Sequence, residues 1–119
     1  MIDKNLKKKL LDDLETIKRK LEIDFHIDLY FYENRMISFS NSSKRYIKLG
    51  LIGTSKTHTL RTKLVHEAIH QLKIEHNPLS RRLGYYSGWE RDELSPKVEK
   101  WIFEGGEKPY ELDYLRRQT

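Results

Sequence analysis

The sequence of 119 residues has no cysteine, only three prolines and no long apolar run. Disulfides and cysteine-ligated zinc are therefore excluded, and any metal would have to be held by His, Asp or Glu. No stretch is apolar over the roughly 20 residues that a membrane-spanning helix needs, so we expect no membrane partner. Roughly the first 20 residues are too charged for a signal peptide. We therefore expect a protein that begins near Met1 and is cytoplasmic.

Apolar residues make up 37% of the chain, which is enough for one modest core, so we expect a single domain over residues 1–119. The formal net charge is +5, with Lys and Arg spread through most segments. Such a spread is typical of a solvated surface. A basic chain also has some affinity for nucleic acid, which is therefore not excluded as a partner. A homodimer is an alternative to a monomer.

The first half of the chain predicts a helix and three strands. Leucines recur at helical spacing through Asp3–Glu22, which predicts a helix with one buried face. Apolar and polar residues alternate in Asp24–Tyr32, which predicts a strand, and a short connection predicts that Arg35–Ser40 returns beside it as a hairpin. Arg45–Ile52 is the third strand of this small, mainly antiparallel sheet. Within it, Gly50 would let another backbone or a ligand approach closely.

The second half predicts helices. Leu60–His76 reads as a helix capped by Thr57 or Thr59, and Asn77-Pro78 ends it. A further helix has Ser95 as its expected N-cap and Pro96 at its first position, and it ends at Gly105-Gly106. Residues 107–119 form a short helix or a docking tail. The fold class expected from this order is α+β.

The central helix contains the motif His66-Glu67-Ala68-Ile69-His70, or H-E-x-x-H. Two histidines four apart on a helix lie one turn from each other, so both rings can reach one metal ion. The helix buries Leu64, Ala68 and their neighbours on another face, and the histidines lie off it. Glu67 is then placed to take a proton from an activated water.

Zinc held by two histidines needs a third protein ligand. His76 completes the histidine spacing of the metzincins, which have Gly where this chain has Lys73. If the helix continues, His76 projects roughly 80–120° away from the first two histidines. A left-handed Lys73 would cost about 1 kcal/mol or more. We therefore place His76 behind other candidates.

Carboxylates later in the chain are the other candidates for the third ligand. Glu99 falls inside the apolar arc of its predicted helix, where a carboxylate is costly unless it meets a cation or hydrogen-bond donors. An ion pair of Glu99 with a Lys or Arg at the rim of that arc would explain its position equally well. Glu90 and Glu93 precede this helix, and they or Asp92 could instead orient a ligating histidine. Glu99 is our first choice.

The order of elements and the residues His66, Glu67, His70 and a later Glu resemble the zincin metallopeptidases, and most closely the minigluzincins. The resemblance implies one Zn²⁺ per chain, a peptide or protein substrate, and hydrolysis with Glu67 as general base. Tyr85 and Tyr86 are candidates for stabilising the oxyanion, although loop packing also explains them.

The resemblance also bears on substrate access. Arg45–Ile52 would be the rim of the cleft, to which an extended substrate could add. As in latent minigluzincins, the C-terminal tail could lie in the cleft and block it; docking of the tail on the core is the alternative. Two other functions remain open: a zincin-like binding module without catalysis, and a small basic nucleic-acid-binding protein.

Overall fold

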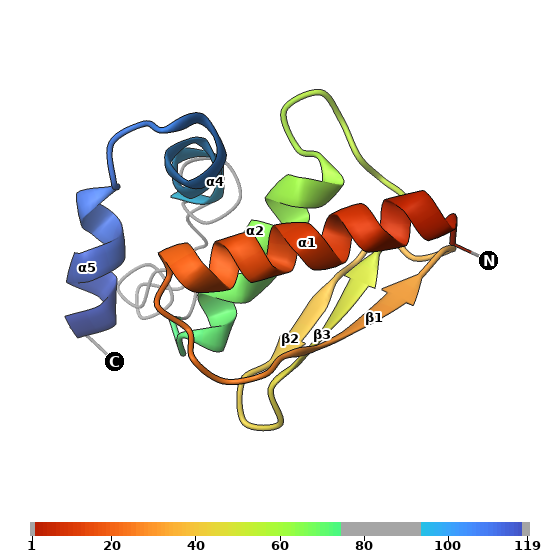
Figure 1. Cartoon of the computed structure of the whole chain (residues 1–119), viewed down its shortest axis with the longest axis horizontal. Helices are drawn as coiled ribbons and strands as arrows, with labels where there is room; N and C mark the ends of the chain where they lie inside the picture. Colours follow the sequence, from red (N-terminus) through yellow and green to blue (C-terminus); the bar gives the residue numbers. More distant parts are fainter. Residues whose placement is uncertain (1, 75–93, 118–119) are drawn as a thin grey trace, which may run out of the picture.

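The structure is a computed structural model that describes residues 2–74 and 94–117. It confirms the α+β class: a helix, a three-stranded sheet, the motif helix and two further helices follow one another (Figure 1). None of the helices in these two ranges is long and apolar enough to cross a membrane. The elements are α1 (Lys4–Lys20), β1 (Asp28–Tyr32), β2 (Phe39–Asn41), β3 (Tyr46–Gly50), α2 (Leu60–Gln71), α4 (Ser95–Glu104) and α5 (Tyr110–Arg117).

The core lies between the helices and one face of the sheet. Ile47 and Leu49 of β3 are fully buried, together with Leu64 and Ala68 of α2. In Figure 1, α1 crosses α2, with the sheet on one side of the crossing and α4 and α5 on the other. Local signals account for the ends of two helices. Thr59 caps α2 through its hydroxyl, and Gly105 ends α4 with a φ of 75°.

The strand order β1-β3-β2 differs from the predicted one. We expected β1 and the next strand to form a hairpin, and this was wrong: β1 pairs with β3 in parallel, and β3 pairs with β2 in antiparallel fashion. The hairpin is the one between β2 and β3, where the Asn41 side chain accepts a hydrogen bond from the Lys44 backbone. The sheet is therefore mixed. β3 is its centre, and β1 and β2 are its edges.

This strand order forces the connection between β1 and β2 to pass the carboxyl end of β3. The passage is tight: a Cβ on Gly50 would lie 2.6 Å from the carbonyl oxygen of Arg35 and 2.8 Å from that of Ile37. The predicted close approach at Gly50 is thus confirmed, and the approaching group is the backbone of this connection. Gly50 is needed here for its missing side chain.

Lys63 of α2 ties the same crossing to the helix. Its side chain is buried, with 6% of the residue exposed. The ammonium donates hydrogen bonds to the carbonyl oxygens of Met36 (2.8 Å), Gly50 (3.0 Å) and Ile52 (2.6 Å). These carbonyls belong to the connection, to the end of β3 and to the loop after it. One buried cation therefore holds three segments of backbone against α2, and burial lowers its pKa.

The C-terminal segment forms α5 and docks on the body of the protein. Leu112 is fully buried in the core. Glu111 accepts a hydrogen bond from Lys97 of α4 at 2.9 Å, and Arg116 donates one to the carbonyl of Leu21 at 3.3 Å. The described tail residues thus adopt the docked arrangement, against α4 and the end of α1.

We predict that Gly50→Ala destabilises the protein by about 2 kcal/mol or more, because the new methyl group meets backbone oxygens that cannot move independently. Gly106→Ala is the control, since a Cβ there meets nothing closer than 3.5 Å. Chemical denaturation measures both. Equal stabilities of the two variants would contradict the tight crossing.

We predict that Lys63→Met lowers the free energy of unfolding by about 2–3 kcal/mol, because three carbonyls lose their shared donor. Lys8→Met, at an exposed position of α1, controls for the loss of one charge. Hydrogen exchange of the amides in 33–38 and 50–53 should also accelerate in Lys63→Met alone. Unchanged exchange there would show that the ammonium does not hold these segments.

Candidate metal centre

The two histidines of the motif lie side by side on α2. The ring centroids of His66 and His70 are 4.9 Å apart and the rings meet edge to face. Both side chains are partly buried, whereas the leucine and alanine positions of the helix face the core. The separation of the two faces that the sequence predicted is therefore confirmed.

Each histidine is oriented through its Nδ1 atom. The Nδ1 of His70 lies 2.9 Å from the carbonyl oxygen of Ile74, which can only accept, so Nδ1 carries the proton and the lone pair of the neutral ring is on Nε2. The Nδ1 of His66 lies 3.3 Å from the hydroxyl of Ser95. Metal-binding histidines are usually held in this way through the nitrogen that does not bind the metal. The donor set fits a zinc ligand pair that uses Nε2.

The end of α2 corrects the prediction for this helix. We expected it to continue to His76, but it ends at Gln71, and Lys73 takes a left-handed conformation with φ 63°. The left-handed turn brings the Ile74 carbonyl back to His70. The strain at Lys73 is therefore accompanied by a hydrogen bond that fixes a motif histidine. Our reason for placing His76 behind other candidates, that the helix persists, was wrong.

The carboxyl of Glu67 lies beside His66. Its Oε2 atom lies 3.9 Å from Nε2 of His66, and the residue is 6% exposed. Burial raises the pKa of Glu67 to about 7, while the positive charge of Lys63, one turn earlier on α2, opposes this rise. A carboxyl whose pKa is near neutrality can both accept and release a proton, which is what a general base and acid needs.

Strand β2 lies along this part of α2. The hydroxyl of Ser40 donates to the backbone oxygen of Glu67 at 3.0 Å, and Gln71 donates to the same hydroxyl at 2.6 Å. Gln71 also lies 3.1 Å from the carbonyls of Asn41 and Tyr46. The edge strand next to the motif is thus β2. We expected a substrate to add to the edge of Arg45–Ile52, and this was wrong, because β3 is paired on both sides and has no free edge.

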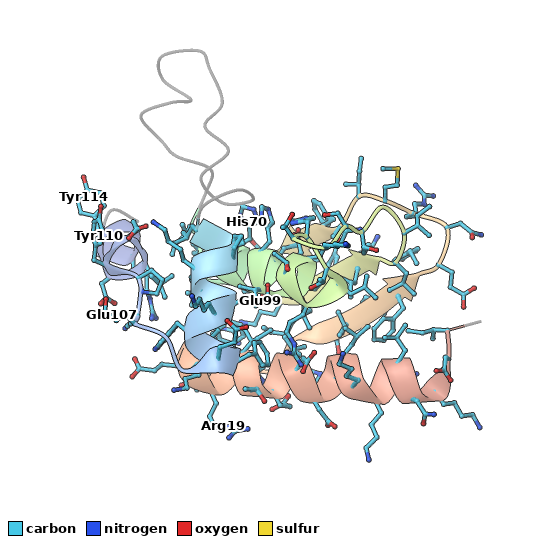
Figure 2. All side chains as sticks on the ribbon, turned by 90° about the horizontal axis from the view of Figure 1, so that it is seen from above. Arg19, His70, Glu99, Glu107, Tyr110 and Tyr114 are labelled. Carbon is cyan, nitrogen blue, oxygen red and sulfur yellow. The ribbon has the colours of Figure 1, made fainter. Side chains whose placement is uncertain are left out.

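Glu99 does not join the histidines in this structure. Its Oε1 atom accepts a hydrogen bond of 2.6 Å from Thr62, a full turn before His66 on α2. Figure 2 shows His70 and Glu99 at separate points beside α4. Within 2–74 and 94–117, no three His, Asp or Glu side chains are close enough to share a metal ion. The apolar position of Glu99 is explained by the Thr62 hydroxyl.

Several candidates fall outside the described residues. These are three alternative ligands, a residue proposed to orient a ligand, and two tyrosines proposed for the oxyanion: His76, Glu90, Glu93, Asp92, Tyr85 and Tyr86. The described residues contain the two candidate histidines and the candidate base, and the alternative candidates for a third ligand lie between Ile74 and Leu94.

Sequence reasoning missed the residues that hold the motif in place. Ser95 was expected to cap α4, but its hydroxyl lies at His66 and α4 begins without a side-chain cap. Lys63 and Gln71 were not singled out. Both are four residues from Glu67 and so lie on its face of the helix, a spacing that could have revealed them.

Comparisons with family models, curated proteins and solved structures gave no match.

In the metal-free protein, we predict that Glu67→Gln is increasingly stabilising as the pH rises. The pKa of Glu67 in the folded state, about 7, lies above its ordinary value of 4.5, so protonation of Glu67 stabilises the folded protein. This stabilisation is complete below pH 4.5 and is lost as the pH rises through about 7. The advantage of the variant should grow by up to about 3 kcal/mol between about pH 5 and about pH 8. Denaturant titrations at several pH values measure it. The same trend in Glu104→Gln, at an exposed position, would contradict burial as the cause.

Proposed function

We propose that this protein is a zinc-dependent peptidase of the zincin type. The observation that carries the proposal is the combination of a buried Glu67 with a pKa near 7 and two adjacent histidines whose Nδ1 atoms are already engaged. His66 and His70 would hold the ion through Nε2. The third ligand would come from His76, Glu90 or Glu93, and the left-handed Lys73 supports His76, since the chain leaves the helix before it.

Bound zinc would lower the pKa of a coordinated water toward neutrality and polarise the scissile carbonyl. The rest of the mechanism belongs to the chain. Glu67 would take a proton from the attacking water and later give it to the leaving amine, as the peptide C–N bond breaks. Burial keeps bulk water away from the carboxyl, and Lys63 limits how far its pKa rises.

The substrate would lie along β2. An edge strand offers backbone donors and acceptors that an extended peptide can pair with. β2 is an edge, and its Ser40 is bonded to the backbone of Glu67, so a peptide paired there would pass close to the base. A peptide or protein substrate and a cytoplasmic location both remain predictions.

Zinc content and hydrolysis of labelled casein test the proposal together. We expect about one zinc per chain after refolding with excess metal, lost in His66→Ala and in His70→Ala. Glu67→Gln should keep the zinc and lose activity by about 100-fold or more, because it removes only the proton transfer. Glu99→Gln should keep both, since Glu99 is bonded to Thr62 instead.

The controls separate the alternatives. Zinc without hydrolysis in the wild type would indicate a binding module. Wild-type protein that takes up no zinc would contradict any metal function. Loss of zinc in Glu99→Gln would restore Glu99 as a ligand and contradict the geometry described above.

A further inference from the structure

The sheet has a second face, turned away from the core and from Glu67. On this face, β1 presents Tyr30 and Tyr32, β3 presents Tyr46 and Lys48, and β2 presents Phe39. We refer to these residues as the aromatic face. Three of the rings are exposed: Tyr30 is 49% exposed, Tyr32 37% and Phe39 51%.

The residues of the aromatic face form one connected surface. The strand register places Tyr30 and Phe39 on either side of Lys48. The ring centroids of Tyr30 and Tyr46 are 6.1 Å apart, and those of Phe39 and Tyr46 are 6.2 Å apart. The ammonium of Lys48 lies 5.6 Å from the Tyr46 ring and 5.8 Å from the Tyr32 ring. The face is thus a connected group of rings, three of them exposed, around a central cation.

The charges around the aromatic face are mostly positive. Lys44 and Arg45 are exposed in the turn that leads into β3, and Arg45 lies 4.3 Å above the ring of Phe25. Among the strand positions of this face, the acidic residue is Asp28, whose carboxylate lies 2.9 Å from the His26 ring. Lys48 on this face and the two exposed basic residues in the adjoining turn give the region an excess of positive charge, which attracts a polyanion.

We propose that the aromatic face binds a single strand of nucleic acid, with bases stacked on its rings and phosphates beside Lys48 and the turn at Lys44 and Arg45. Aromatic side chains in a positive surface are how proteins bind single strands without reading sequence, because every base has a face that can stack. In a duplex the bases are already stacked on each other, so a duplex could use only the charges. The proposal does not depend on peptidase activity.

Exposed rings on neighbouring strands also stabilise a sheet through cross-strand contacts, without any ligand. The two explanations differ at Lys48. If Lys48 contacts a phosphate, its replacement changes how binding depends on salt concentration, whereas a purely structural Lys48 would have no such effect. The proposal differs from a protein-binding surface in requiring a polyanion that has exposed bases.

Fluorescence anisotropy with the full chain tests the proposal. The probes are labelled oligothymidylate and oligouridylate of about 20 nucleotides, and a duplex of the same length, at about 50 mM salt. We expect the single strands to bind more tightly than the duplex. Tyr30→Leu combined with Phe39→Leu should weaken binding about tenfold or more, because Leu keeps an apolar side chain but cannot stack. Tyr110→Leu, at a ring 80% exposed on α5, should leave binding unchanged.

The salt dependence of binding is a second measurement, which can still be made if the double variant does not fold. Lys48→Gln should reduce the slope of log Kd against log salt by about 0.7, the value for one phosphate contact on a single strand. Lys8→Gln makes the same change of net charge on α1 and should not alter the slope. Binding to either sugar type, or to both, supports the proposal and identifies the strand.

Three results would overturn it: duplex binding as tight as single-strand binding, no binding at low salt, or equal affinities of the wild type and both aromatic-face variants.

Discussion

The position of the motif helix depends on one buried cation. Lys63 donates to carbonyls from the β1–β2 connection, the end of β3 and the following loop, and so fixes α2 against the place where the chain crosses itself. Strand order makes this crossing unavoidable, and Gly50 makes it sterically allowed. Without the ammonium, three carbonyls would face each other beside the core, which is unfavourable.

Lys63 begins a polar stripe on α2 that continues with Glu67 and Gln71. The three residues have different roles. Lys63 holds the crossing, Glu67 supplies a carboxyl of raised pKa, and Gln71 bonds β2 and β3. The histidines lie beside this stripe, held by Ser95 and by the Ile74 carbonyl. The arrangement joins the proposed base, the proposed ligands and the edge strand through one helix.

What the sequence predicted well was determined locally. The leucine spacing of α1, the Thr59 cap of α2 and the Gly105 end of α4 each depend on residues within a few positions. The pairing of β1 with β3 depends on residues far apart, and the short connection after β1 favoured a hairpin that did not form.

The end of α2 was missed because a left-handed Lys73 is intrinsically unfavourable, and only the folded protein provides the hydrogen bond to His70 that accompanies it. Glu99 was assigned to zinc because an apolar position demands a partner, but the nearby Thr62 hydroxyl is a sufficient one.

His66 and His70 are proposed to bind one metal ion together, with a third ligand other than Glu99. X-ray absorption at the zinc edge of the loaded protein measures this coordination. We expect at least two imidazoles with Zn–N distances of about 2.0–2.1 Å, and a spectrum that is unchanged in Glu99→Gln. A shell of oxygen atoms without imidazole, or a spectrum that changes when Glu99 is replaced, would contradict it.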